Sequence, residues 1–365
     1  MEQEAFCDCW LWGNGDGKLV LGNATNIGNS AFYNCAGLES IETGSSLRTL
    51  GSSAFSGCSG LKTATIDGSG LYLDGTFNGC SNLESVVFGD SVTGMAEGSS
   101  YRWWSGAFTS CPKLRKLTFG CGLKTVPTAA FLGLVGLEEV AIPGATVVQM
   151  EAFMGCTNLT NVVLSPELTE IGQAAFSNCW NLAKCNDEDK LTLTNVVKVG
   201  SSAFAGCTSL REVEFGNAIA RLDTMAFRGC TGLRSARIGG AGLYLNTETF
   251  SGCTNLESVC FGDGVTGMAA GSSYWEYSSV FRQCPNLRKV ECGSGLKTVP
   301  TYAFNNLRNL EEVSMPGVSV IQRAAFKGCT NLVRFSLPED VASVEQEAFC
   351  STHIQRSRNG TANPG

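Results

Sequence analysis

The residues with the greatest potential for chemistry are 18 cysteines and a single histidine, His353. A zinc site is typically built from Cys-x-x-Cys pairs or from histidines, and the sequence contains no Cys-x-x-Cys pair. A catalytic histidine has to be oriented by a third group, and a position close to the end of the chain is a poor place for that. We therefore expect no catalytic residue, no metal site and no cofactor.

Paired charges are the second candidate for chemistry. Two glutamate pairs and two basic pairs stand at related positions of the chain: Glu138 with Glu139, Glu311 with Glu312, Arg115 with Lys116, and Arg288 with Lys289. Neighbouring carboxylates can perform general acid–base catalysis. Here, however, acids and bases would face each other across neighbouring strands, where opposite charges attract. We interpret them as a solvated charge ladder.

Two short segments carry the oxygen ligands that calcium prefers, residues 14–17 (Asn-Gly-Asp-Gly) and residues 186–189 (Asn-Asp-Glu-Asp). Neither segment has the spacing of an EF-hand loop. The same residue types are typical of plain turns. We therefore favour turns, with weak calcium binding as the alternative.

The elements that position these residues are repeats. A motif of Ala-Phe-x-x-Cys recurs along the chain at a nearly constant interval, as from Phe32 to Phe55 and from Phe55 to Phe77. The phenylalanines of the motif are Phe6, Phe32, Phe55, Phe77, Phe108, Phe131, Phe153, Phe176, Phe204, Phe227, Phe250, Phe281, Phe304, Phe326 and Phe349. Because an apolar residue at a fixed period is typical of a core, we interpret every phenylalanine as buried.

A short strand follows each motif. The pattern after the cysteine is x-x-Leu-x-x-apolar-x-apolar, as in residues 137–142 (Leu-Glu-Glu-Val-Ala-Ile). The last three positions alternate inward, outward and inward, which predicts a strand. A unit this short cannot bury its apolar face alone, so it must stack on its neighbours. The sequence therefore predicts turns, or rungs, whose strands form a parallel sheet with about 4.8 Å between neighbours.

Twelve cysteines occupy the motif position: Cys9, Cys35, Cys58, Cys80, Cys111, Cys156, Cys179, Cys207, Cys230, Cys253, Cys284 and Cys329. Two rungs have leucine there, Leu134 and Leu307. A position that accepts leucine is an apolar packing position, in which a free cysteine behaves as a small hydrophobic residue. We therefore expect most of these thiols to be buried and reduced.

The chain also contains a large internal duplication. The offset from Phe32 to Phe204 recurs from Phe55 to Phe227, and it grows by a single position for the later pair Phe108 and Phe281. Long strings recur at the same offset, such as residues 122–128 and 295–301. We predict a single solenoid over residues 1–352, with copies at about 6–179 and 180–352, followed by a disordered tail over residues 353–365.

The pattern Ile-Gly-x-x-Ala-Phe-x-x-Cys-x-x-Leu at residues 27–38 resembles the BspA-like leucine-rich repeats, and the resemblance covers nearly the entire chain. It implies an α/β solenoid that is mostly β, a leucine-rich-repeat stack of about 15 short rungs with a parallel sheet on one face. Members of that family are often surface or secreted proteins of bacteria and protists, implicated in adhesion and protein binding. The resemblance therefore implies a non-enzymatic binding module.

Two insertions, at residues 89–104 and 262–277, provide candidate binding residues. Each lengthens one rung, so that the interval from Phe77 to Phe108, like that from Phe250 to Phe281, exceeds the usual one. Insertions in a solenoid emerge as surface loops, often on the binding face. Trp, Tyr and Arg are the residue types of binding hot spots. The candidates are Tyr101, Arg102, Trp103, Trp104, Tyr274, Trp275 and Tyr277. The alternative is that these aromatic residues fold back and cover the edge of the solenoid.

Charge and hydropathy narrow the partners. A net charge of −7 argues against nucleic acid as a partner. The sequence contains no run of 18 apolar residues, so we predict no membrane span. We expect a protein ligand, with a glycan as the alternative. The resemblance implies the cell surface or secretion. Residues 1–4 (Met-Glu-Gln-Glu) do not begin a signal peptide, however, and many thiols favour a reducing compartment. An intracellular, cytoplasmic scaffold is therefore the alternative function.

Overall fold

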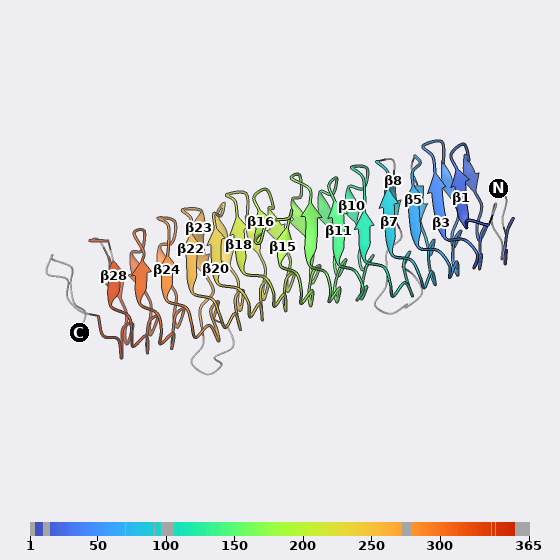
Figure 1. Ribbon diagram of the computed structural model, residues 1–365. Helices are drawn as coiled ribbons and strands as arrows, with labels where there is room; N and C mark the ends of the chain where they lie inside the picture. Colours follow the sequence, from blue (N-terminus) through green and yellow to red (C-terminus); the bar gives the residue numbers. More distant parts are fainter. Residues whose placement is uncertain are drawn as a thin grey trace. The chain divides into compact units, whose positions relative to one another are not determined.

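The computed structural model describes residues 4–9, 15–69, 71–90, 92–95, 106–271, 279–336, 338–339 and 341–354. It contains two compact units, Met1–Asp187 and Glu188–Gly365, called unit 1 and unit 2 below. Within the described residues both units consist of short strands joined by turns (Figure 1). The predicted solenoid with a parallel sheet is confirmed, but these residues include no helix. None of them therefore belongs to an apolar helix of membrane-spanning length.

Each unit has a main sheet, to which every rung adds one parallel strand. In unit 1 these strands are β1 (Lys18–Leu21), β3 (Ser40–Thr43), β5 (Thr63–Ile66), β7 (Ser85–Phe88), β9 (Lys116–Thr118), β11 (Glu139–Ile142), β13 (Asn161–Leu164) and β15 (Lys184–Cys185). The register places like residues side by side: Val140 of β11 is opposite Val162 of β13, and both are fully buried. The predicted alternation thus sends one column of side chains into the core.

The main sheet of unit 2 repeats this arrangement. Its strands are β16 (Leu191–Leu193), β18 (Glu212–Phe215), β20 (Ser235–Ile238), β22 (Ser258–Phe261), β24 (Lys289–Glu291), β26 (Glu312–Ser314) and β28 (Arg334–Ser336). Val213 of β18 is opposite Ala236 of β20, and both point inward. The duplication seen in the sequence is therefore also a duplication of strand register.

A second line of shorter parallel strands, which the sequence analysis did not predict, precedes the phenylalanine motifs. In unit 1 it comprises β2 (Asn26–Ile27), β4 (Thr49–Leu50), β6 (Leu71–Leu73), β8 (Val92–Met95), β10 (Thr125–Val126), β12 (Val147–Val148) and β14 (Glu170–Ile171). In unit 2 it comprises β17 (Lys198–Val199), β19 (Arg221–Leu222), β21 (Leu243–Leu245), β23 (Val265–Met268), β25 (Thr298–Val299), β27 (Val320–Ile321) and β29 (Ser343–Val344). Strands therefore occupy two sides of each rung rather than one.

The third side of each rung carries the phenylalanine motif as a chain of turns. The N–H groups of Ser30, Phe32 and Asn34 donate to carbonyls of the next rung at 3.0, 2.8 and 2.8 Å. Ser30 and Asn34 are left-handed, with φ of 49° and 56°. The left-handed residues before and after the phenylalanine orient these alternate amides toward the same neighbouring rung. Because every second amide bonds to the next rung rather than along the chain, the turns do not become helices.

The phenylalanines of the motif stack into a column inside each unit. The ring centroids of Phe32 and Phe55 are 5.2 Å apart in unit 1, and those of Phe304 and Phe326 are 5.1 Å apart in unit 2. The prediction that every phenylalanine is buried is wrong for Phe6, which is 39% exposed, and for Phe335 and Phe349, which are only half-buried. Phe6 stacks on Phe32, with the two ring centroids 5.3 Å apart.

The number of complete rungs is slightly smaller than the 15 predicted. After Phe349, which follows β29, no further strand exists among the described residues. Between Phe176 and Phe204 the main strand is divided into two short strands. The first, β15, belongs to unit 1, and the second, β16, belongs to unit 2. The extra residues that divide it include the predicted turn at 186–189.

Candidate ligand-binding surfaces

All seven predicted binding residues lie outside the described part of the chain: Tyr101, Arg102, Trp103, Trp104, Tyr274, Trp275 and Tyr277. The structure does correct the extent of the two insertions. Val92–Met95 and Val265–Met268, which the sequence analysis included in them, are the regular strands β8 and β23. Val92 and Met95 are buried in the core. Each insertion therefore begins only after its strand, on the way to the next phenylalanine turn.

An exposed tyrosine stands on the strand next to each of these two strands. Tyr72 of β6 and Tyr244 of β21 are 56% and 51% exposed and occupy equivalent positions of the two copies. Tyr72 is opposite Gly94 of β8, and Tyr244 is opposite Gly267 of β23. A Cβ atom added at Gly94 or Gly267 would lie 3.4 or 2.7 Å from the tyrosine ring. Each ring therefore lies over a glycine, and we call these pairs the tyrosine platforms.

A break in strand register accompanies both platforms. The pairing shifts between Leu71 and Tyr72 in unit 1 and between Leu243 and Tyr244 in unit 2. Such bulges re-aim a side chain and often occur beside functional sites. The sequence analysis missed these tyrosines. Their signal is the Leu-Tyr-Leu triplet, buried, exposed and buried, which occurs in both copies.

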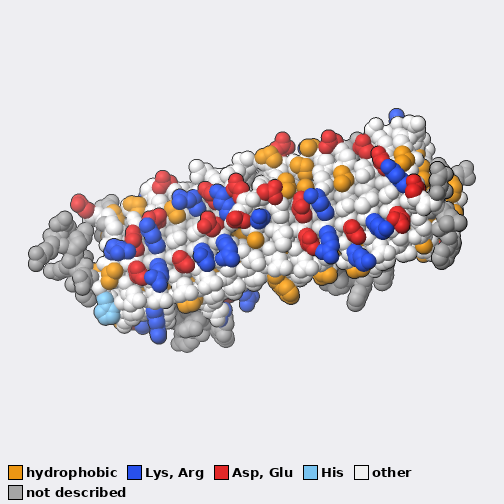
Figure 2. Space-filling view, in the orientation of Figure 1, with side chains coloured by type: hydrophobic (Ala, Val, Ile, Leu, Met, Phe, Trp, Pro, Cys, Tyr) orange, Lys and Arg blue, Asp and Glu red, His pale blue; other side chains and the backbone are white. Residues whose placement is uncertain are grey.

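The outward side chains of the main sheets are the second surface. Figure 2 shows acidic and basic side chains gathered over this face. In unit 1, Lys62 Nζ lies 2.7 Å from Glu39 Oε2, Lys116 Nζ lies 2.9 Å from Glu139 Oε1, and Arg115 pairs with Glu138. The predicted charge ladder is confirmed in this unit. Exposed pairs of this kind contribute only about 0.2–1 kcal/mol each to stability.

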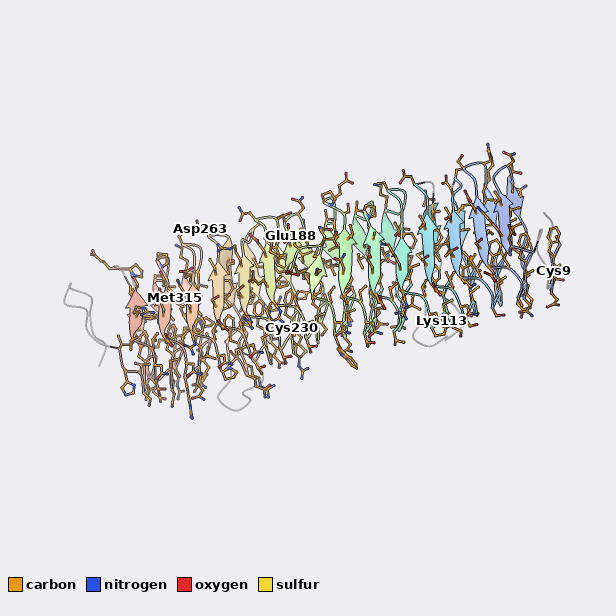
Figure 3. All side chains as sticks on the ribbon, viewed as in Figure 1. Cys9, Lys113, Glu188, Cys230, Asp263 and Met315 are labelled. Carbon is orange, nitrogen blue, oxygen red and sulfur yellow. The ribbon has the colours of Figure 1, made fainter. Side chains whose placement is uncertain are left out.

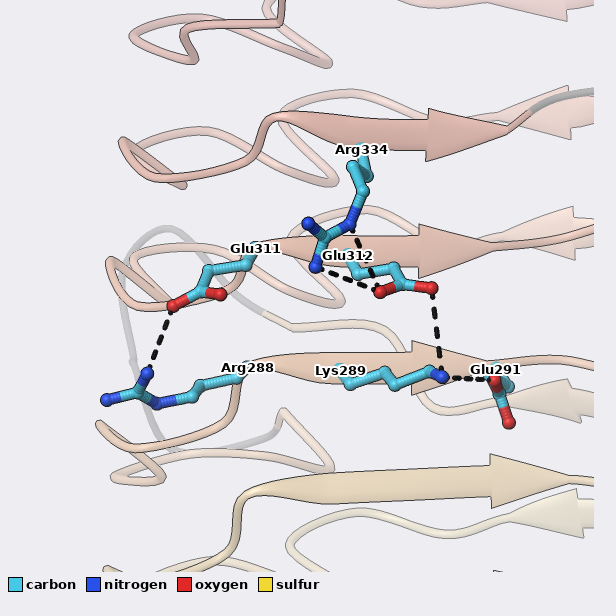
Figure 4. Close-up of polar contacts among 6 residues, drawn as sticks. All are labelled: Arg288, Lys289, Glu291, Glu311, Glu312 and Arg334. Atoms are coloured by element: carbon cyan, nitrogen blue, oxygen red, sulfur yellow. Dashed lines mark hydrogen bonds and ion pairs between the residues drawn. The ribbon is translucent and has the colours of Figure 1, made fainter.

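Unit 2 has the corresponding ladder, drawn in Figure 4. Arg288 Nη1 lies 3.2 Å from Glu311 Oε1, and Lys289 Nζ lies 2.6 Å from Glu291 Oε1 and 3.7 Å from Glu312 Oε1. The hydrogen bond from Lys289 lowers the pKa of Glu291. A carboxylate whose ionised form is favoured in this way is poorly suited to act as a general acid at neutral pH. The ladder is therefore a set of exposed ion pairs between residues of neighbouring strands.

The motif cysteines do more than fill an apolar position. Ten of them place their sulfur 2.9–3.1 Å from the phenylalanine carbonyl of the preceding rung, as Cys230 does with Phe204. The thiol donates to this oxygen, which neither Leu134 nor Leu307 can do. Burial raises the pKa of the Cys230 thiol to about 12. The cysteines are therefore structural thiols rather than activated nucleophiles.

An aspartate joins the two rungs on either side of each insertion. In unit 2 the amide and hydroxyl of Ser294 donate to Asp263 Oδ1 at 2.7 and 2.9 Å, which lowers the pKa of Asp263. In unit 1 the amide of Cys121 donates to the equivalent Asp90 at 2.7 Å. Figure 3 shows Asp263 among the loops that follow the main strands, whereas Cys230 lies toward the turn side. These contacts keep neighbouring rungs in register across each long insertion.

The segment at 186–189 forms a turn, as favoured from the sequence. Asn186 and Asp187 are left-handed, and their side chains bond the Leu164 amide and the Asn161 side chain, both at 2.8 Å. No group of three or more metal-binding side chains occurs among the described residues. His353 Nδ1 donates to the Thr330 carbonyl at 2.6 Å, so this residue of the predicted tail contacts a turn, and residues 355–365 lie outside the description.

Known structures of leucine-rich repeat proteins are similar to this chain. One from Bacteroides ovatus ATCC 8483 is 22% identical, with a TM-score of 0.62 over 87% of this chain and 77% of that chain. One from T. pallidum is 25% identical, with a TM-score of 0.37 over 53% and 77%. A leucine rich cell surface protein from Faecalibacterium prausnitzii A2-165 is 20% identical, with a TM-score of 0.36 over 91% and 85%. No curated protein matches.

The first of these structures supports the fold, and the sequence itself supports the family. Four segments match the family described as "BspA type Leucine rich repeat region (6 copies)", at residues 2–103, 104–195, 185–273 and 277–360. Together they cover nearly the whole chain. The protein therefore belongs to the BspA type leucine-rich repeat family.

Proposed function

We propose that this chain is a non-enzymatic module of the adhesion type, which binds a protein ligand at the cell surface or after secretion. The family is one of repeat scaffolds that bind proteins. The observation that carries the proposal is the pair of tyrosine platforms. Tyr72 and Tyr244 expose more than half of their surface at equivalent positions, each on the strand that pairs with the strand preceding an aromatic insertion.

The platforms and the insertions together have the composition of binding hot spots. A tyrosine buries a large area on contact and loses little conformational entropy, because it has few rotatable bonds. At both platforms the next strand has a glycine opposite the tyrosine, so this paired residue places no side chain against the ring. An exposed aromatic ring held in this way is poised for contact with a partner. The platforms support the earlier hypothesis that Trp103, Trp104 and their counterparts contact a ligand.

The test is an array of purified extracellular proteins and glycans, probed with the wild-type chain and with variants. We expect Tyr72→Ser combined with Tyr244→Ser to abolish binding to one or more proteins, and Trp103→Ala combined with Trp104→Ala to do the same. The matched control is Tyr33→Ser, because Tyr33 is also exposed but lies on the turn side. Melting temperatures of all variants are measured in parallel.

Three results would count against the proposal. If the tyrosine variants bind as tightly as the wild type, the platforms are not the contact surface. If the tryptophan variant melts much earlier than the wild type, those residues cover the solenoid instead of binding a ligand. If the chain binds only glycans on the array, the proposed ligand class, a protein, is wrong.

One observation favours the second candidate function, an intracellular scaffold. Ten motif cysteines bond backbone carbonyls as thiols, which requires that they stay reduced. Reduced thiols persist most readily in a reducing compartment. Mass spectrometry of the protein from its native source, alkylated after denaturation, separates the two functions. A full set of alkylated cysteines favours the scaffold, whereas disulfides between rungs favour the cell surface.

A further inference from the structure

The outermost column of each charge ladder can be compared position by position. In unit 1 the column is Glu39, Lys62, Glu84, Arg115 and Glu138, and in unit 2 it is Arg211, Arg234, Glu257, Arg288 and Glu311. The offset of the internal duplication makes each unit 2 residue the counterpart of the unit 1 residue at the same place in this order. Charge alternates along the whole column of unit 1. In unit 2 only the first position has changed sign, so that Arg211 stands beside Arg234.

The backbones at this first position are alike, which makes the side chains a matched comparison. The Lys62 amide donates to the Glu39 carbonyl at 2.8 Å, and the Arg234 amide donates to the Arg211 carbonyl at 2.7 Å. Lys62 Nζ then donates to Glu39 Oε2 at 2.7 Å. Within the described part of unit 2, neither Arg211 nor Arg234 has an ion-pair partner. Two like charges one strand apart repel each other.

The neighbouring side chains show that this surface carries mixed charge. Arg237 is on β20, about 10 Å further along the chain than Arg234 at the usual rise per residue, and Arg234 directly precedes that strand. Glu212, which follows Arg211 directly, and Glu257, which precedes β22, are both exposed. The nearby Glu214 carboxylate accepts a hydrogen bond from Lys190 at 3.1 Å. We call Arg211, Arg234 and Arg237 the arginine cluster.

We propose that a partner protein places a carboxylate between Arg211 and Arg234, so that Arg234 gains the kind of partner that Lys62 has in Glu39. Arginine is well suited to this task because its planar guanidinium binds carboxylates through two donors. A carboxylate bound there removes the repulsion that the free surface retains. The inference concerns the main sheet and does not depend on the tyrosine platforms.

The partner is a protein surface of mixed charge rather than a uniform polyanion. Glu212 and Glu257 lie beside the arginine cluster, so a polymer that carries only negative charge would meet repulsion from both glutamates. A protein can offer an acidic side chain to the arginines and basic side chains to the two glutamates. Complementarity of this kind confers specificity, because a partner with the wrong charge order is rejected.

The experiment measures binding of the full chain to three immobilised polymers: polyglutamate, polylysine and a random copolymer of glutamate and lysine. We expect the copolymer to bind best, with an affinity that falls as salt is added. Arg211→Glu should weaken copolymer binding about tenfold, because Arg234 then acquires a carboxylate partner within the chain. Glu39→Arg, which builds a second cluster in unit 1, should strengthen it.

The same variants also report on folding, so that loss of structure is not mistaken for loss of binding. Arg211→Glu restores the charge order of unit 1 and should melt no earlier than the wild type; Arg211→Gln serves as a second variant. Unchanged copolymer binding by both Arg211 variants would overturn the proposal. Tighter binding to polyglutamate than to the copolymer would show that the surface prefers a polyanion, and tighter binding to polylysine would show that the acidic residues dominate.

Discussion

Units 1 and 2 have nearly the same inward side chains but different outward side chains. Phe131 and Phe304 occupy equivalent positions, and both are buried in a stack of rings. Glu39 and Arg211 also occupy equivalent positions, yet they carry opposite charge. An inward residue has to match the rungs on both sides, whereas an outward residue meets only solvent and its strand neighbours. The interior thus specifies the fold, and differences between the units indicate which surfaces have separate roles.

Some inward positions depart from this rule, and Phe119 is the clearest case. Phe119 of unit 1 is stacked on Phe88 with their ring centroids 4.7 Å apart. The equivalent of Phe119 in unit 2 is Cys292, which is also buried. Unit 2 therefore exchanges an aromatic contact for a buried thiol. The two units should respond differently to any condition that ionises thiols.

The largest expected effect tests whether the two cores are equivalent. Phe131→Ala and Phe304→Ala should each lower the free energy of unfolding by roughly 3–5 kcal/mol, because each removes a buried ring from the column. Denaturant titration monitored by circular dichroism measures the loss. The control is Val135→Ala, since Val135 is 53% exposed. A loss below about 1 kcal/mol for either phenylalanine would contradict its place in the core.

Alkaline pH provides the second test. Burial raises the pKa of the Cys230, Cys284 and Cys292 thiols from 9.0 to about 12. A folded-state pKa above the unfolded value means that the folded protein holds the proton more tightly. The resulting stability is fully present below pH 9 and is lost as the pH rises from about 9 to about 12. Each such thiol should contribute about 1.4 kcal/mol of destabilisation per pH unit in that window.

The variant Cys292→Phe restores the unit 1 residue and isolates one of these thiols. Between pH 9 and pH 11 its free energy of unfolding should fall less steeply than that of the wild type, by about 1.4 kcal/mol per pH unit. Denaturant titrations at several pH values measure this slope. Val135→Ala, which removes no ionisable group at an exposed position, should keep the wild-type slope. Identical slopes for Cys292→Phe and the wild type would mean that this thiol does not ionise on unfolding.

The periodic part of the structure could be predicted from the sequence because periodicity reports burial. Residues such as Phe131, Leu137 and Val140 recur at fixed spacing, and the spacing alone places them inside. The second line of strands could not be predicted in this way. Many of its strands, such as Asn26–Ile27, have two residues, which is too short for alternation to be recognised.

The candidate surfaces depend on contacts between rungs, which a single repeat does not reveal. That Tyr72 faces Gly94 follows from a register shift, and that Cys230 reaches the carbonyl of Phe204 follows from the offset between rungs. Only the charge ladder was visible beforehand, because its acids and bases occupy the same position of successive repeats. The sequence analysis therefore found the residues of the ladder but not the tyrosine platforms.

The smallest expected effect separates the two tyrosine platforms. A methyl group at Gly94 would lie at ordinary contact distance from Tyr72, at 3.4 Å, whereas at Gly267 it would lie 2.7 Å from Tyr244 and displace the ring. Both substitutions to alanine change the unfolded chain in the same way, so their difference isolates the contact with the ring. Gly267→Ala should be less stable than Gly94→Ala by a few tenths to about 1 kcal/mol, the usual range for a cross-strand pair. Denaturant titration gives the difference, and tyrosine bands in near-ultraviolet circular dichroism should change for Gly267→Ala alone. Equal losses and equal spectra would mean that the two rings are seated alike. A greater loss for Gly267→Ala would instead show that Tyr244, whose ring lies closer to its glycine, forms the more rigid of the two platforms.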